Sequence, residues 1–223
     1  MTCRGNRRVA VKQWTLGVLG IGLSLCLGCS AHADSIAINV VDRDQQPLPG
    51  VLVSLHGPGL PQPQPELMVL SQEGRRFIPQ VLAITVGSDV DFLNKDGITH
   101  HVYSFSRPWR QQFRLSDDEN QVHTFSTPGR VVLGCNIHDW MLGYIYVMET
   151  PVFGFTDESG NFERDQIPAG TYTLRIEHPR LRDGRGKIER ELVVAEGGVG
   201  QLSIELQKAL LPKRDQIPRE DYR

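Results

Sequence analysis

Cysteine is scarce in this sequence and is concentrated near one end. Four cysteines occur in 223 residues, and three of them, Cys3, Cys26 and Cys29, lie close to the N-terminus. If that end is removed on export, Cys135 has no disulfide partner, which excludes a disulfide-stapled fold. A lone thiol in an exported protein needs protection from oxidation, and a bound metal ion would provide it. The alternative is that Cys135 is a buried cysteine acting as a small hydrophobic residue.

Other patterns are also missing. No long segment has the helical spacing of apolar residues, and alternating apolar runs separated by turn residues predict an all-β chain. No Gly-rich phosphate loop, paired-carboxylate motif or Ser/His/Asp arrangement stands out, so we expect the protein not to be an enzyme. A thiol hydrolase built on Cys135 and His138 is disfavoured, because no orienting third group or oxyanion loop is evident.

The first 33 residues have the features of a secretory signal peptide. Four basic residues precede an apolar run over 14–27, and Ala31-His32-Ala33 is a small-x-small cleavage site. The run is too short, and wrongly flanked, for a membrane-spanning segment. We therefore expect a protein that is cleaved before Asp34, does not span a membrane and is located in the periplasm. Lipid attachment at Cys29 is the alternative, and mass spectrometry of the mature N-terminus distinguishes the two.

Removing this segment changes the charge of the chain. It leaves 20 Lys and Arg residues against 26 Asp and Glu residues, a formal net charge of −6. Such a surface argues against nucleic-acid binding and is compatible with a basic partner protein.

The densest chemistry lies in one short segment between two predicted strands. An apolar run over 131–135 ends at Cys135, His138 and Met141 follow at intervals of three residues, and a second apolar run begins at Leu142. Thiolate and thioether are soft ligands that favour Cu(I), imidazole serves Cu(II) as well, and two His with one Cys and a distant Met is the pattern of a blue-copper site. The chain must then supply a second histidine, and His100 does so at the start of an alternating run.

At these residues the chain resembles the cupredoxin family, over about a third of its length. One segment matches the family at Phe77, Pro79, Gly87, Val90, Phe92, Asn94, Asp96 and His100. A second segment matches at Phe125, Pro128, Gly129, Cys135, His138, Met141, Gly143, Ile145 and Val147. The residues around His100 and Cys135 are most similar to bacterial proteins labelled methylamine utilization proteins. The resemblance implies one copper ion, Cu(I) or Cu(II), held by His100, Cys135, His138 and Met141.

Two neighbours of these ligands depart from the family pattern. His101 stands where asparagine is usual, so it either links the two ligand segments or competes with His100 for the metal. Regular alternation along a strand places it on the opposite face from His100 and favours His100. Asp139, next to His138, would stabilise Cu(II) and lower the reduction potential. Trp109 and Trp140 are candidates for the rim of a docking site, although burial is the default for tryptophan.

The segments on either side of the copper segment resemble a second family, the carboxypeptidase regulatory-like, transthyretin-type sandwiches. The later part of that signature is present at Thr156, Asp157, Gly160, Phe162, Pro168, Gly170, Tyr172 and Leu174, and the earlier part at Asp42, Pro47, Leu48, Gly50 and Val53. Two N-terminal strands alone are marginally stable and need later strands to cover their apolar face.

We therefore predict a cupredoxin-like Greek-key β-sandwich inserted into, or packed with, a second β-sandwich. The predicted parts are a signal peptide (1–33), a discontinuous sandwich (35–57 plus 150–207), a copper domain (70–149) and a flexible tail (208–223). Packing of Ile38 and Val53 against Leu174 and Ile204 would distinguish insertion from pairing with the copper domain.

The sequence thus favours a periplasmic type 1 copper protein that carries single electrons to or from a redox partner, either a cytochrome or an oxidoreductase. The alternatives are a copper carrier or sensor without redox turnover, and a metal-free interaction module with an inert Cys135.

Overall fold

The computed structural model describes residues 35–182 and 186–212. The predicted signal peptide (1–33) and the last eleven residues of the predicted tail lie outside the described residues. Within the described ranges all regular elements are strands, so the prediction of an all-β chain is confirmed. No helix in the described part of the chain has the length and hydrophobicity to cross a bilayer.

Within residues 35–182 and 186–212, sixteen strands form four sheets. Their bounds are β1 (Ile36–Val41), β2 (Leu52–His56), β3 (Leu67–Gln72), β4 (Phe77–Ile78), β5 (Val81–Thr85), β6 (Asp89–Asn94), β7 (His100–Ser106), β8 (Trp109–Leu115), β9 (Asn120–Thr124), β10 (Gly129–Cys135), β11 (Leu142–Met148), β12 (Phe153–Phe155), β13 (Asn161–Arg164), β14 (Gly170–Glu177), β15 (Lys187–Val194) and β16 (Val199–Glu205).

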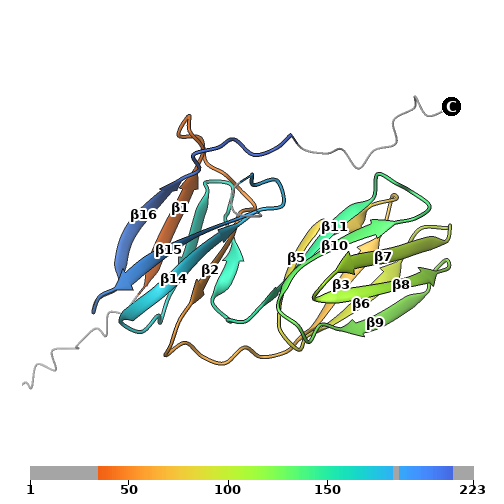
Figure 1. The fold of residues 1–223 in the computed structure, drawn as a ribbon, viewed down its shortest axis with the longest axis horizontal. Helices are drawn as coiled ribbons and strands as arrows, with labels where there is room; N and C mark the ends of the chain where they lie inside the picture. Colours follow the sequence, from red (N-terminus) through yellow and green to blue (C-terminus); the bar gives the residue numbers. More distant parts are fainter. Residues whose placement is uncertain (1–34, 183–185, 213–223) are drawn as a thin grey trace, which may run out of the picture. The chain divides into compact units, whose positions relative to one another are not determined.

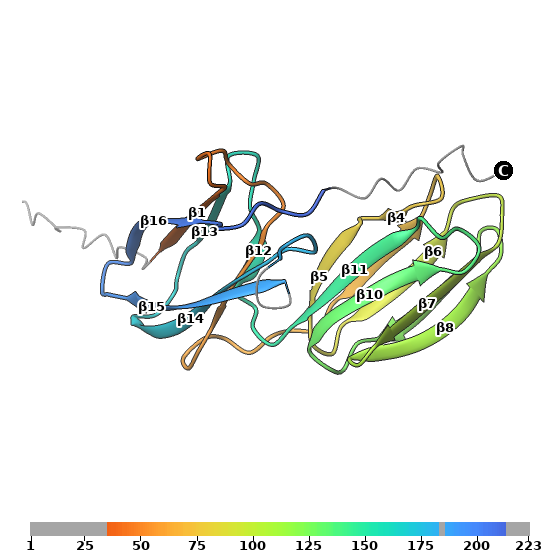
Figure 2. The same ribbon diagram turned by 45° about the horizontal axis from the view of Figure 1, so that its top comes forward.

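Nine consecutive strands, β3 to β11, form what we call the central sandwich. One of its sheets has the order β5-β11-β10-β7-β8 and the other the order β4-β3-β6-β9 (Figures 1 and 2). Buried and more exposed residues alternate along these strands because every second side chain faces the interior. In β6, for example, Val90 and Phe92 are buried. Side chains from both sheets, among them Leu70, Phe92 and Leu133, meet in one hydrophobic core.

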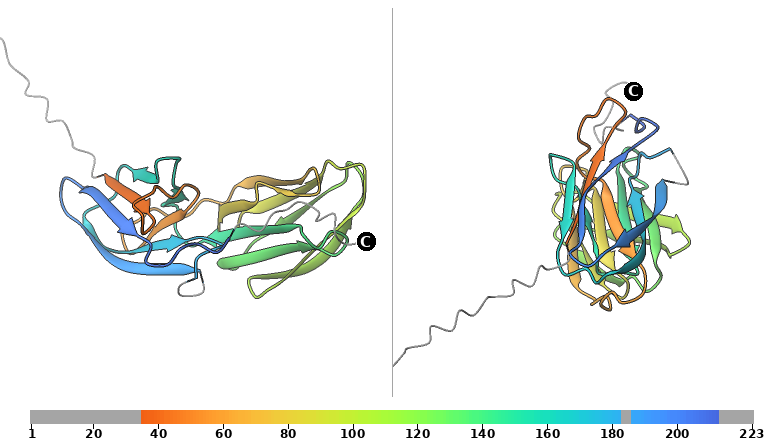
Figure 3. Two further views of the ribbon diagram at one scale, coloured as in Figure 1. Left: turned by 90° about the horizontal axis from the view of Figure 1, so that it is seen from above. Right: turned by 90° about the vertical axis from the view of Figure 1, so that its left-hand side faces the viewer.

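The remaining strands form what we call the split sandwich. Its sheets have the orders β13-β1-β16 and β12-β2-β14-β15, and Figure 3 shows each sandwich as two layers of strands. Ile38 and Val53 share one core with Leu174 and Ile204, whereas Phe92 belongs to the core of the central sandwich. The strands β1 and β2 are therefore separated from their partners in the sequence by the whole central sandwich. The exact domain boundaries stay a prediction.

Candidate metal centre

The thiol lies at the end of a central strand of its sheet. β10 pairs with β11 along one edge and with β7 along the other, and Cys135 is its last residue. The side chain of Cys135 is 3% exposed and is the free cysteine of the described chain. The strand ends there because the six residues up to Met141 form the loop that leads into β11. A central strand fixes the sulfur rigidly while the loop that follows is free to bring further side chains around it.

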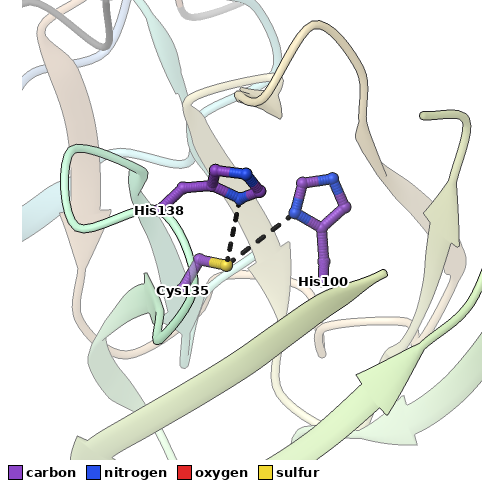
Figure 4. A group of neighbouring side chains, drawn as sticks. All are labelled: His100, Cys135 and His138. Atoms are coloured by element: carbon purple, nitrogen blue, oxygen red, sulfur yellow. Dashed lines mark hydrogen bonds between the residues drawn. The ribbon is translucent and has the colours of Figure 1, made fainter. Parts of the chain in front are cut away.

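Two histidines converge on this sulfur from different segments. His100 is the first residue of β7 and is fully buried, and its Nδ1 lies 3.8 Å from Cys135 Sγ. His138 comes from the loop, and its Nδ1 lies 3.7 Å from the same sulfur. Figure 4 shows the three side chains pointing toward one another. One atom from each lies within 4.8 Å of the others, the single such grouping of His, Cys, Asp or Glu found in the described residues.

These separations fit one shared ion. A trigonal ion about 2.3 Å from a thiolate and about 2.0 Å from each imidazole nitrogen would separate sulfur from nitrogen by roughly 3.7 Å. The two observed sulfur–nitrogen distances agree with that value. Two imidazoles and one thiolate in a trigonal arrangement are the donor set preferred by copper in electron-transfer sites.

Asp96 orients His100. The sequence motif included Asp96 but assigned it no role. Asp96 Oδ2 lies 2.8 Å from His100 Nε2, so the other ring nitrogen, Nδ1, is directed at the sulfur. The backbone N–H groups of Gly74 and Arg75 donate to the two oxygens of Asp96, at 2.7 and 2.8 Å. Carboxylates commonly hold metal-binding histidines in this way and fix which nitrogen is available. The spacing of four residues between Asp96 and His100 is compatible with this contact but does not by itself predict it, because the carboxylate is fixed by the distant backbone of Gly74 and Arg75.

The electrostatics favour the metal-binding protonation states of Cys135 and His138, whereas at His100 they favour the protonated ring. Burial opposes ionisation of Cys135, but hydrogen bonds from His100 and from the backbone N–H groups of His101, Ile137 and His138 outweigh it and lower the pKa of the thiol. Burial alone would lower the pKa of His100, yet its bonds to Cys135 and Asp96 raise it. Burial and the nearby charge of His100 lower the pKa of His138, leaving its imidazole neutral. A thiolate and a neutral imidazole are the metal-binding forms of these groups.

His101 points away from this cluster and instead connects the two ligand-bearing segments. Its carbonyl accepts a bond from the backbone N–H of Asn136 at 3.0 Å, and its ring Nδ1 lies 3.3 Å from Asn136 Nδ2. Of the two adjacent histidines, the structure brings His100 to Cys135, and His101 takes the linking position. The cause is strand alternation, which buries His100 and leaves His101 half-buried.

Met141 closes the loop. Its side chain is 2% exposed and packs in the same core as Cys135, and its backbone N–H donates to the carbonyl of His138 at 3.0 Å. That bond fixes the backbone on both sides of Asp139. The role of Met141 as a weak axial ligand stays a prediction.

The other candidates differ in where they lie: Trp109 is in the core, and Trp140 and Asp139 are next to His138. Trp109 is buried and stacks between Phe92 and Phe125, so it is a core residue. Trp140 is half-buried, with its ring centroid 5.2 Å from that of His138. Asp139 is exposed, so its charge is more strongly screened by water than that of Asp96.

The three other histidines in the described part of the chain have structural surroundings. His56 shares a hydrogen bond with Ser54 at 2.9 Å, and His178 Nδ1 accepts the backbone N–H of Arg180 at 3.1 Å. The ring of His123 packs against Phe113, with centroids 4.6 Å apart.

No protein-family model and no curated protein matches this chain. Among solved structures, a purple cupredoxin from Nitrosopumilus maritimus is similar at 20% identity and a TM-score of 0.33, covering 36% of this chain and 99% of that one. A Cu(I) structure of an amicyanin mutant is similar at 17% identity and a TM-score of 0.34, covering 37% and 82%. A copper-containing nitrite reductase from Thermus scotoductus gives 28% identity and a TM-score of 0.34, covering 49% of this chain and 28% of that one. TM-scores this low carry no argument about function, and the case for a metal rests on the side chains described above.

Proposed function

We propose that this chain is a type 1 copper protein in which His100, Cys135 and His138 hold one ion and Met141 is its weak axial ligand. The observation that carries the proposal is the convergence of three buried donors on one point, at distances that suit a trigonal ion. Copper bound there would supply a single-electron redox couple.

The burial of the donors favours electron transfer over catalysis. His100, Cys135, Met141 and His138 are 0, 3, 2 and 8% exposed, so the four side chains are almost closed off from solvent. A catalytic metal keeps an open coordination position, whereas an electron carrier needs rigid ligands that move little when the charge changes. We infer a carrier rather than an enzyme, with the electron entering or leaving near His138, the most exposed of the four.

The chain's own residues provide the rigidity. Cys135 and His100 belong to paired strands, with Cys135 directly opposite Val102 in the register of β10 and β7. Asp96 hydrogen-bonds to Nε2 of His100, the ring nitrogen that does not face the sulfur. The backbone hydrogen bond between Asn136 and His101 joins the two segments that carry the ligands. The N-terminal sequence motivates export to the periplasm, where a cytochrome or an oxidoreductase would be the partner. A role in methylamine utilization is a finer proposal, based on the sequence resemblance alone.

One experiment separates this proposal from its rivals. The chain from Asp34 onward is loaded with Cu(II), and its visible spectrum and reduction potential are recorded. An intense thiolate-to-copper band with a reversible one-electron potential is the expected result. Tight Cu(I) binding without that band would indicate a copper carrier or sensor instead. Absence of binding would leave a metal-free interaction module.

A further inference from the structure

The outer face of β7 and β8 combines aromatic and cationic side chains in register. Along β7, Val102 and Ser104 point inward, whereas His101, Tyr103 and Phe105 point outward. The outward residues of β7 lie opposite the outward residues of β8, in the pairs His101 with Arg114, Tyr103 with Gln112, and Phe105 with Arg110. β8 is the edge strand of its sheet, so its cations line the border of this face.

The aromatic half of this face is unusually open. Phe105 is 70% exposed, the highest value among the large hydrophobic side chains described, and its ring centroid lies 5.2 Å from that of Tyr103. Both line a shallow hollow of about 270 Å³ together with Val132 and Leu142. Burying an exposed phenylalanine ring is favourable, and most of the Phe105 ring is still available to be buried by a partner.

The cationic half has no internal counter-charge. Arg110 and Arg114 are exposed, and neither forms an ion pair within the described chain. Asp139 is the one carboxylate among the residues lining the hollow. In the other sheet of the same sandwich, by contrast, Asp89 and Asp91 accept hydrogen bonds from neighbouring side chains on β9. Charge is therefore segregated between the two sheets, although the chain as a whole is acidic.

We propose that this face, defined by Tyr103, Phe105, Arg110, Gln112 and Arg114, docks an acidic patch on a partner protein. Arginine binds carboxylates through two parallel hydrogen bonds, and an exposed aromatic ring beside it supplies the desolvated centre that such interfaces need. Nucleic acid fits less well, because two arginines do not form a continuous stripe and the net charge of the chain repels a long polyanion. The net charge of the chain is compatible with a basic partner, whereas the local charge of this face favours an acidic one.

The face also leads directly to the candidate metal centre. The ring of Tyr103 lies against Gly134, where an added Cβ would approach the ring to 2.5 Å. Gly134 is bonded to Cys135, so only Tyr103 and Gly134 separate a partner seated on Tyr103 from the residue that carries the sulfur. Electron exchange through this contact rests on the proposed copper function, but the docking itself does not.

The test uses the metal-free chain from Asp34 onward, so that its outcome is independent of copper. Binding of a fluorescein-labelled oligoglutamate is measured by fluorescence anisotropy over a series of salt concentrations. We expect saturable binding that weakens with salt, and at least a tenfold loss in the double variant Arg110→Glu/Arg114→Glu, or about 1.4 kcal/mol. Phe105→Ser, which changes no charge, should weaken binding several-fold.

A matched control changes the net charge equally elsewhere. Arg43→Glu/Arg190→Glu alters two exposed arginines of the split sandwich that form no ion pair in the described chain. It should weaken binding less than about threefold, a difference of under 1 kcal/mol. The proposal fails if this control loses as much as the β8 variant, if Phe105→Ser changes nothing, if the wild-type chain does not bind, or if single-stranded DNA binds more tightly than oligoglutamate.

Discussion

The two sandwiches of this protein both bury histidines, yet they use them differently. In the split sandwich, His178 is buried and accepts a hydrogen bond from the backbone N–H of Arg180. Burial, and to a lesser extent the charge of Arg180, lowers the pKa of His178 to about 4. In the central sandwich, His100 is buried more completely, but partners on both ring nitrogens raise its pKa. Burial alone therefore produces a neutral structural histidine. His100 is instead a candidate metal ligand because its ring lies between the thiol of Cys135 and the carboxylate of Asp96.

The largest expected effect on the difference between the two sandwiches comes from removing the sulfur of Cys135. Cys135→Ser should abolish the thiolate-to-copper band and weaken Cu(II) binding by more than about 100-fold, since even outer contacts of metal sites cost 10–100-fold. Visible spectroscopy and a competition titration measure both effects. His178→Asn, in the other sandwich, should keep the full band. A retained band in Cys135→Ser would show that the sulfur is not a ligand.

A cavity in the split sandwich should affect stability without affecting the metal centre. Leu174 is 1% exposed in that core, so Leu174→Ala should lower the free energy of unfolding by about 2–5 kcal/mol. Thermal unfolding followed by circular dichroism measures the loss. The copper band of the folded variant should match that of the wild type. A changed band at a temperature where the variant is folded would contradict the separation of the two cores.

Two histidines of the split sandwich, the half-buried His56 and the buried His178, should make it acid-sensitive. The pKa values of His56 and His178 are lowered from 6.5 to about 4, mainly by burial, so the unfolded chain takes up protons first as pH falls. Their contribution to stability is complete above about pH 6.5 and is lost as pH falls toward 4.

His178→Asn tests this, because an amide oxygen can accept the Arg180 N–H without titrating. The melting temperature of this variant should fall less steeply between pH 6.5 and 4 than that of the wild type. Parallel curves for the two proteins would show that His178 does not titrate in this range.

The smallest expected effects distinguish the two carboxylates of the central sandwich. Asp96→Asn replaces a charged acceptor on His100 with a neutral one, which destabilises Cu(II) and should raise the reduction potential. The difference between charged and neutral hydrogen bonds is roughly 1 kcal/mol, or about 40 mV for one electron. Asp139→Asn should raise the potential less, because Asp139 is exposed. Potentiometry that ranks Asp139 above Asp96 would overturn this assignment of roles.

The sequence predicts the loop around Cys135 well for a physical reason. The apolar runs on either side are central strands buried on the core face, and the structure has β10 and β11 there. The strands β8 and β9 are polar edge strands, and only their pairing with β7 and β6 makes them strands. Apolar alternation cannot reveal such segments.

The same limit applies to the candidate site. Cys135 and His138 are recognisable by their spacing, and His100 by its place at the start of an alternating run. The contact between Asp96 and His100 depends on the turn around Asp96, where the backbone of Gly74 and Arg75 fixes the carboxylate. That turn is built by two segments about twenty residues apart, and no local pattern encodes their meeting.

The order of the strands along the chain has a consequence for biosynthesis. Asn39 of β1 meets Asn161 of β13 across 122 positions, so the first two strands leave the ribosome long before their partners. Every strand of the central sandwich finds its neighbours within that sandwich. The central sandwich can therefore be complete while β1 and β2 still have exposed edges, a state in which pairing with another chain competes with maturation.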